Sequence, residues 1–457
     1  MLRFFEELVS SIWNRIHHRR GSKQDGGGMF LGFQVTEGQV TKRKVGLTAT
    51  RRTTHIAVLG KTGSGKSSLL RHMAQQDIES DRGFVCIDLH GDMAKFLLRA
   101  IAAREARLQE DLSGRLIVIE PADWEFSVGL NPLEQKTPDF VRIAEFSEIL
   151  KRRWGLDHFG ARTDELLRNA LYVLSANDLT LLELAPLLTH TGFRAQCLKK
   201  TPNAEVRQYF EIRYGQVSEP MRATMREPIL NKTSAFTADA RFRHLVGQTQ
   251  STFSMRESMD QGDWIIAALP KGELGSQSLT LASLLFTMTR NAIFARERRS
   301  LFTIYCDEIQ NLIAQSSDVE TVLSEARKFG VSIVSANQFL DQYPAEVRAA
   351  ILSVGNHCFF QLSPGDAGQI AQVLDGGRSL AERLKNLTQR HFVMKSGADP
   401  WKELCVPTVH DPKVDFRDLL DRSRARRARA RQEIEREIVE RHAAFTKTND
   451  EVLNDWE

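Results

Sequence analysis

Short runs of consecutive apolar residues alternate along the chain with longer segments in which apolar residues recur every three or four positions. Runs of this length are typical of strands buried on both faces, and the periodic segments are typical of helices. Strands that alternate with helices predict an α/β fold, with a mainly parallel sheet covered by helices on both faces. The runs lie at residues 56–59, 84–88, 116–119, 264–269, 301–306, 331–335 and 357–361, with further strand-like sequence at 391–394.

Helical periodicity dominates the middle of the chain, and we expect an all-α insertion domain there. The glycine-rich sequence GSKQDGGG predicts a flexible linker near the N-terminus, and the last forty residues are polar and helix-prone. The expected segments are an N-terminal amphipathic helix with its linker (1–28), the two parts of the α/β domain (29–137 and 251–412), the all-α insertion (138–250), and a basic, then mixed-charge, helical tail (413–457).

Composition adds limits on partners and compartment. The net charge is only +4, so any contact with nucleic acid must come from local clusters. The 5 cysteines are scattered without C-x-x-C spacing, which favours buried, reduced thiols in a cytoplasmic protein.

No apolar run is long enough to cross a membrane, and the N-terminus lacks the apolar core of a signal peptide. We therefore expect no transmembrane segment. Phe5, Leu8, Ile12 and Ile16 do recur at helical spacing near the N-terminus. We favour a helix that docks on the body or on a neighbouring subunit. Peripheral contact with the inner membrane is the alternative.

One glycine-rich sequence carries the clearest chemistry. Residues 60–67 read GKTGSGKS, directly after the strand-like run at 56–59 and before a helical segment. Such a turn wraps backbone N–H groups around phosphates, and the helix N-terminus adds positive charge at the same place. We expect it to bind ATP, with Lys66 on the β- and γ-phosphates and the Ser67 hydroxyl on Mg²⁺. The predicted nucleotide-binding residues are Gly60, Lys61, Thr62, Gly63, Ser64, Gly65, Lys66, Ser67 and Ser68.

A second apolar run ends in two adjacent acids, Asp307 and Glu308. Carboxylates at the carboxyl end of a buried strand lie where open α/β sheets bind nucleotides. We expect Asp307 to hold Mg²⁺, and Glu308 to orient and polarise the attacking water.

Two further residues fit the same chemistry. Gln338 follows the next predicted strand, and its amide could sense the γ-phosphate. Arg327 lies in the segment before that strand and could reach a neighbouring subunit's nucleotide; a plain surface arginine is the alternative.

The strings GKTGSGKS, FTIYCDEIQNL and SEARKFGVSIVSANQ together resemble the FtsK/HerA superfamily, and most closely the coupling-protein and HerA-type ATPases of type IV secretion and conjugation. DLHGD resembles a D-P-H-G-D turn of that family, with Leu89 where proline is usual, and GLNPL resembles another of its motifs. The resemblance covers about residues 54–361.

This resemblance implies a RecA-like P-loop core in a hexameric ring that moves DNA through its centre. It makes Lys66 and Ser67 the Walker A pair, Asp307 and Glu308 the Walker B pair, and Gln338 the sensor, with Arg327 near the arginine that acts in trans. Membrane-bound coupling proteins carry N-terminal transmembrane helices, which this chain lacks. The chain is then either a soluble relative or one whose partner supplies the anchor.

Three basic stretches are candidates for contact with DNA. Residues 422–431 (RSRARRARAR) contain six arginines and no acid; the alternatives are a solvated helix or packing against acidic neighbours. Residues 152–154 and 241–244 mix charge with aromatic rings that could stack on bases, although a helix surface with one buried ring is commoner. Lys271, which follows a predicted core strand, is a further guess at a pore-loop residue.

We therefore predict an ATP-hydrolysing ring motor that translocates DNA in conjugative or type IV secretion transfer, with relaxase or secretion-channel partners. Two alternatives remain open. One is a HerA-type motor that partners a nuclease or effector in DNA processing or phage defence. The other is a nucleotide-gated adaptor that docks substrates onto a secretion channel.

Overall fold

The computed structural model describes residues 28–134, 140–156, 160–312 and 316–454. The expected N-terminal amphipathic helix therefore lies outside the described residues. Within them the main sheet has 11 strands. These are β1 (Met29–Thr36), β2 (Gln39–Leu47), β3 (Ile56–Leu59), β4 (Phe84–Asp88), β5 (Leu116–Ile119), β7 (Trp264–Ala268), β8 (Phe302–Asp307), β9 (Val331–Asn337), β10 (Asn356–Phe359), β11 (His391–Ser396) and β12 (Lys402–Cys405).

The strand order is β2-β1-β12-β11-β10-β3-β9-β8-β4-β7-β5. All pairs from β10 to β5 are parallel, and those from β2 to β10 are antiparallel. The parallel strands β3, β4 and β7 are buried along their whole length, as parallel strands covered on both faces should be. The predicted α/β fold with a mainly parallel sheet is thus confirmed.

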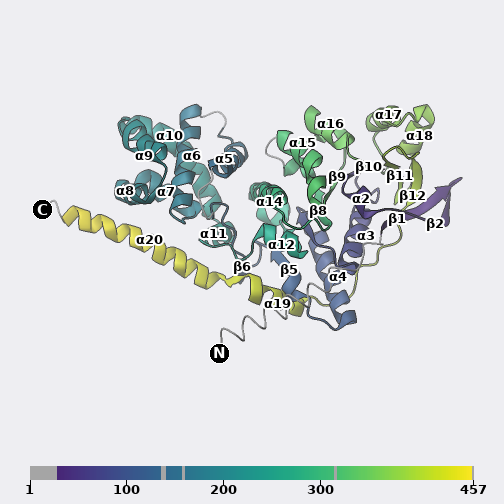
Figure 1. Ribbon diagram of the computed structural model, residues 1–457, viewed down its shortest axis with the longest axis horizontal. Coiled ribbons are helices and arrows are strands. Elements are labelled where there is room, and N and C mark those ends of the chain that lie inside the picture. The colour runs from purple at the N-terminus through teal and green to yellow at the C-terminus, as the bar shows by residue number, and fades with distance from the viewer. Residues whose placement is uncertain (1–27, 135–139, 157–159, 313–315, 455–457) are drawn as a thin grey trace.

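Helices cover both faces of this sheet (Figure 1). On one face, α3 (Lys66–Glu79) and α4 (Asp92–Leu108) pack against alternate strand residues such as Cys86 and Ile266. On the other face, α14 (Gln277–Phe294) and α16 (Ala345–Leu352) pack against the intervening residues, such as Ile87 and Ile265. The remaining helices of the α/β part are α2 (Ala49–Arg52), α12 (Met255–Gln261), α13 (Lys271–Leu274), α15 (Ser316–Glu325), α17 (Pro364–Val373) and α18 (Gly377–Lys385).

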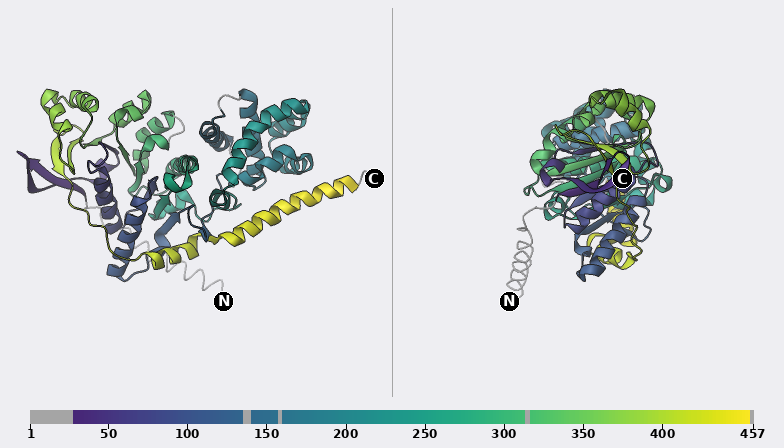
Figure 2. Two further views of the ribbon diagram at one scale, coloured as in Figure 1. Left: turned by 180° about the vertical axis from the view of Figure 1, so that it is seen from behind. Right: turned by 90° about the vertical axis from the view of Figure 1, so that its right-hand side faces the viewer.

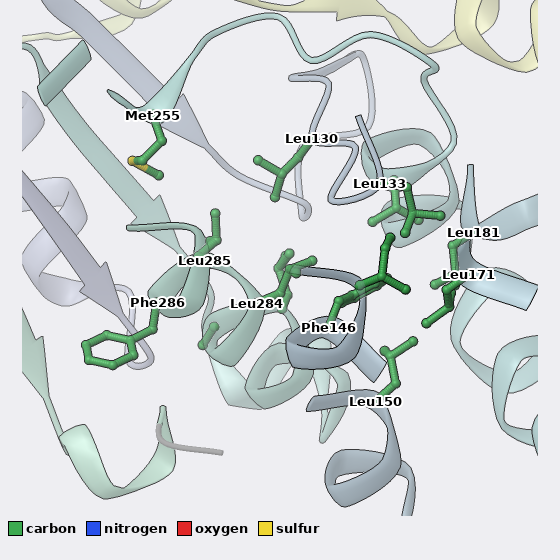
Figure 3. Close-up of a cluster of buried hydrophobic side chains, with 14 of the residues drawn as sticks. Leu130, Leu133, Phe146, Leu150, Leu171, Leu181, Met255, Leu284, Leu285 and Phe286 are labelled. Atoms are coloured by element: carbon green, nitrogen blue, oxygen red, sulfur yellow. The ribbon is translucent and has the colours of Figure 1, made fainter. Parts of the chain in front are cut away.

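Between β6 (Phe126–Ser127) and α12, all regular elements of the described residues are helices, joined by short turns and loops. Figure 3 shows how it joins the rest: Phe146 and Leu150 of this segment meet Leu284 of α14 in one apolar cluster. The helices and the sheet therefore share a continuous core. Whether residues 138–250 form a separate domain stays a prediction. The helices are α5 (Phe140–Trp154), α6 (Ala161–Ala176), α7 (Leu184–Thr189), α8 (Thr191–Lys200), α9 (Ala204–Gln208), α10 (Glu219–Thr237) and α11 (Ala240–Val246).

The C-terminal segment joins the two parts from outside. Helix α19 (Arg417–Arg427) packs on β5, strand β13 (Arg429–Ala430) pairs with β6, and α20 (Arg431–Asn454) continues along α8 and α11. Figures 1 and 2 show this yellow segment running from the sheet to the helical part. We call residues 417–441 the arginine strap. Among the described helices, none is long and apolar enough to span a membrane.

Candidate nucleotide-binding site

The glycine-rich loop connects β3 to α3, as its sequence predicted. Gly63 and Gly65 have φ of 77° and 117°, in the region that glycine favours. A Cβ on Gly65 would also lie 2.8 Å from the Cα of Arg390, so no side chain fits there. Two requirements, a left-handed backbone and a close approach of another segment, thus fix glycine at this position.

The loop has hydrogen-bond donors without acceptors. Within the described residues, the N–H groups of Gly63, Gly65, Lys66 and Ser67 have no hydrogen-bond acceptor. They surround the N-terminus of α3, where the helix dipole adds positive charge. The Lys66 ammonium folds back and donates to the carbonyl oxygens of Gly60 (2.5 Å) and Lys61 (3.0 Å). This arrangement is suited to a polyphosphate, whose oxygens would accept from these donors.

The sheet order brings the other predicted residues to the same edge. Strand β9 lies between β3 and β8, and its end delivers Gln338 beside the loop. The Thr62 hydroxyl donates to Gln338 Oε1 at 3.0 Å, and the Gly60 N–H donates to the carbonyl of Asn337 at 3.1 Å. The predicted sensor therefore touches the glycine-rich loop directly.

Asp307 ends β8 one strand further on and is electrostatically linked to the loop. Burial raises the pKa of Asp307, while the neighbouring His90 and Lys66 act in the opposite direction. Burial likewise lowers the pKa of Lys66, opposed by Asp307 and Glu308. The lysine and both carboxylates thus form one charged cluster, and a bound divalent cation would favour ionised Asp307.

Glu308 occupies an unusual backbone position. Its φ of 57° is left-handed, and its N–H donates to the carbonyl of Ala336 at 2.8 Å. Its carboxylate accepts from the Lys271 ammonium at 3.0 Å and from the Asn311 amide at 2.7 Å. Strained backbone at a non-glycine residue persists only where its surroundings hold it, and here several contacts do so.

The predicted DLHGD turn has a structural role beside these acids. The buried Asp88 carboxylate accepts hydrogen bonds from the N–H groups of His90, Gly91 and Ala94, at 2.8 to 2.9 Å. It thereby stabilises the start of α4 and fixes the turn next to Asp307.

Comparison with known proteins agrees with this geometry. Residues 35–158 match the family model described as the central domain of the helicase HerA. The plasmid coupling protein TrwB in complex with ADP and Mg²⁺ has a TM-score of 0.62 at 16% identity, over 86% of this chain and 98% of TrwB. The chain has the HerA/FtsK-type P-loop ATPase fold.

Further solved structures extend the match. The unbound bacterial conjugative coupling protein TrwBdeltaN70 has a TM-score of 0.60 at 16% identity, over 88% of this chain and 94% of that one. VirB4 of Thermoanaerobacter pseudethanolicus has a TM-score of 0.54 at 16% identity, over 84% of this chain and 98% of VirB4. No curated protein sequence matches significantly. The predicted resemblance to the FtsK/HerA superfamily is confirmed at the level of fold.

Arg327 is the one predicted site residue that the HerA/FtsK-type fold does not bring to the others within one chain. It is exposed, in a turn (Ala326–Phe329) before β9, whereas Gln338 follows the same strand. Strand β9 has 7 residues, so the two ends lie about 20 Å apart. A role for Arg327 at a neighbouring subunit's nucleotide stays a prediction.

Two candidate DNA-contacting regions make contacts within the protein. In the run 422–431 every arginine bonds an acid or a carbonyl of the protein; examples are Arg422 with Glu105 and Asp111, and Arg424 with Asp123. Phe242 is fully buried and is not available to stack on a base. The interpretation of 422–431 as packing against acidic neighbours is correct, because the body offers acids along its path.

The remaining two candidates have different outcomes. Lys271, guessed as a pore-loop residue, pairs with Glu308. In the run 152–154, Arg153 donates to the carbonyl of Asn311, next to the candidate site, and the side chains of Arg152 and Trp154 lie outside the described part. The motifs did not predict Asn311 as a site residue, nor the pairing of Lys271 with Glu308. The only signal was that each residue lies three positions beyond a landmark of the site, Lys271 after the end of β7 and Asn311 after Glu308.

Proposed function

We propose that the chain is an Mg²⁺-dependent ATPase that assembles as a ring and translocates DNA. The carrying observation is the convergence of the glycine-rich loop, Asp307, Glu308 and Gln338 at the carboxyl edge of one parallel sheet. The proposal is supported by the likeness to TrwB bound to ADP and Mg²⁺ and, separately, to a non-hydrolysable ATP analogue.

The residues present fit this substrate. The free N–H groups and Lys66 would hold the phosphates, and Ser67 and Asp307 would hold Mg²⁺, which neutralises charge on the phosphoryl group. Glu308 would orient the attacking water and accept its proton. Gln338 would report loss of the γ-phosphate, because it already contacts Thr62 of the loop.

DNA transfer is the more specific part of this proposal, beyond ATP hydrolysis. The structures most relevant to it are named as conjugative or plasmid coupling proteins. We infer a homo-hexamer with nucleotide between subunits, where the exposed Arg327 would stabilise charge on the neighbour's phosphoryl group. Relaxase or channel proteins would be its partners, at the cytoplasmic side of the inner membrane.

The test is DNA-stimulated ATP hydrolysis by the purified protein. Wild type should hydrolyse ATP in the presence of Mg²⁺ and turn over faster with DNA. Lys66→Ala should reduce turnover at least about 100-fold, because it removes the ammonium that folds back over the loop and would contact the phosphates. Lys385→Met is the control, since the Lys385 ammonium pairs with Glu382 of α18 and not with a residue of the candidate site. Undiminished hydrolysis by Lys66→Ala would reject the site.

An adaptor would give a different result. A protein that only docks substrates should bind ATP but show no stimulation by DNA. Imaging with a slowly hydrolysed ATP analogue and DNA would report ring formation in the same samples.

A second candidate function is a HerA-type motor that partners a nuclease or effector. It is favoured by the match of residues 35–158 to the central domain of the helicase HerA. Genes beside this one separate the two: relaxase and channel genes support transfer, and a nuclease gene supports DNA processing or defence.

A further inference from the structure

The Glu308 carboxylate is held through only one of its two oxygens. The Lys271 ammonium and the Asn311 amide both donate to Oε2, at 3.0 and 2.7 Å. Within the described part of the chain, Oε1 has no hydrogen-bond partner. Two donors on one oxygen orient a carboxylate and leave the other oxygen free to accept.

Each of the two donors is itself anchored. The Lys271 N–H donates to the carbonyl of Leu89 at 3.0 Å, which ties α13 to the turn after β4. The Asn311 N–H donates to the carbonyl of Glu308 at 2.8 Å, and the Asn311 carbonyl accepts from Arg153 of α5. The position of Glu308 is therefore set by the sheet, by its own turn and by the helical insertion together.

The sheet order shows from which side Lys271 acts. The loop strand β3 and the Lys271 strand β7 lie on opposite sides of β8, each two strands away. Lys66 and Lys271 thus flank the acids from opposite sides. Lys271 lies outside the phosphate-binding loop and pairs directly with Glu308, the carboxylate whose charge raises the pKa of its neighbour Asp307.

We propose that Lys271 is a positioning residue for ATP hydrolysis. Together with Asn311 it fixes Oε2 of Glu308, so that Oε1 is presented to the attacking water. This inference rests on the proposed ATPase function. An unpaired glutamate samples several rotamers, whereas polarising a water requires placement to within a fraction of an ångström. Lys271 therefore acts on the chemical step and not on nucleotide binding.

The test compares Lys271→Met with Lys271→Arg. Methionine keeps most of the length of the side chain and removes the ammonium; arginine keeps the charge. We expect Lys271→Met to lower kcat about 10-fold, with KM for ATP and Kd for a fluorescent ATP analogue changed less than about twofold. Lys271→Arg should recover much of kcat. Asn311→Ala removes the second donor and should lower kcat in the same direction.

Lys385→Met is the matched control, because Lys385 has similar exposure (30%, against 34% for Lys271) and also pairs with a glutamate. It should leave kcat unchanged. Wild-type kcat in both Lys271→Met and Asn311→Ala would overturn the inference, as would a rise, which would mean that Lys271 restrains Glu308. If Lys271→Met loses DNA affinity while its kcat without DNA stays at the wild-type value, Lys271 is a pore-loop residue and not a positioning residue, which would also overturn the inference. If wild type itself hydrolyses no ATP, the proposed function fails as well.

Discussion

Two basic regions of this molecule use their positive groups in opposite ways. In the glycine-rich loop, Lys66 bonds only to carbonyls of its own loop, and several N–H groups have no acceptor within the described residues. In the arginine strap, the guanidinium groups bond to carboxylates and carbonyls of the body. Donors without internal partners indicate a ligand site, whereas donors that are already paired indicate a structural contact.

Arg431 shows how complete the internal pairing of the strap is. It is 4% exposed and donates to the carbonyls of Pro121 (2.9 Å), Ala240 (3.0 Å) and Phe126 (3.3 Å). These carbonyls come from the sheet side and from the helical side of the molecule. The side chain therefore links the two parts at the point where α20 begins.

The sharpest test of the nucleotide-binding site, to which the glycine-rich loop belongs, is Glu308→Gln. Glutamine keeps the size of the side chain but cannot take the proton of the attacking water, so turnover should fall about 100-fold or more. ATP binding should persist, because the loop donors are untouched. Single-turnover hydrolysis and equilibrium binding of a fluorescent ATP analogue separate the two effects.

Glu382→Gln is the matched control, since Glu382 pairs with Lys385 on an exposed helix. It should hydrolyse ATP as wild type does. Loss of nucleotide binding in Glu308→Gln would contradict the role given to this carboxylate.

In the arginine strap the largest effect on stability is expected from Arg431→Met. The change leaves buried carbonyls without donors, and we expect the free energy of unfolding to fall by about 3 kcal/mol. Urea denaturation measures this. Arg436→Met on the same helix is the control, because Arg436 is exposed and its loss should cost less than about 0.5 kcal/mol. Equal stability of the two variants would mean that the strap does not hold the two parts together.

The same contrast explains what the sequence could and could not predict. The phosphate-binding loop is contiguous, so the strand, the glycines and Lys66 could be located from residues 56–67 alone. Asp307 and Gln338 could be placed because carboxyl ends of parallel strands meet at one edge. The partners of 422–431 could not be predicted, since Glu105, Asp111 and Asp123 are about 300 residues away in the chain and only the fold brings them together. The pairing of Lys271 with Glu308 could not be predicted either, because only the fold brings the ends of β7 and β8 together.

The strap also lies beside one poorly paired acid, which gives a pH-dependent test. Asp263 is buried, its Oδ2 has no hydrogen-bond partner within the described residues, and Arg427 is 3.9 Å away. Burial raises the pKa of Asp263 to about 6, although the charge of Arg427 opposes the shift. A raised pKa in the folded state means that its stabilising contribution is full below about pH 4 and is lost as the pH rises through 6.

Asp263→Asn cannot ionise, so it should be more stable than wild type at pH 7, by about 2 kcal/mol. The difference should disappear as the pH falls below about 4. Urea denaturation of both proteins between pH 4 and pH 8 checks this. A constant difference across that range would show that the effect is not one of ionisation, and that Arg427 neutralises Asp263 despite its distance.

The smallest effect is expected from the partly exposed arginines of the strap, when DNA binding is measured. Arg422 and Arg426 are partly exposed, at 34% and 48%, and look suited to DNA, but both pair with Asp111. Exchanging both for glutamine should change DNA affinity less than about twofold. It should leave the dependence of DNA binding on salt unaltered, because no phosphate contact is lost.

Lys42→Gln with Arg43→Gln removes the same charge from exposed positions on β2 and controls for net charge. If the strap contacts DNA, its double variant should instead lose about two counterions from the salt dependence of binding, since each lost phosphate contact lowers that slope by about one.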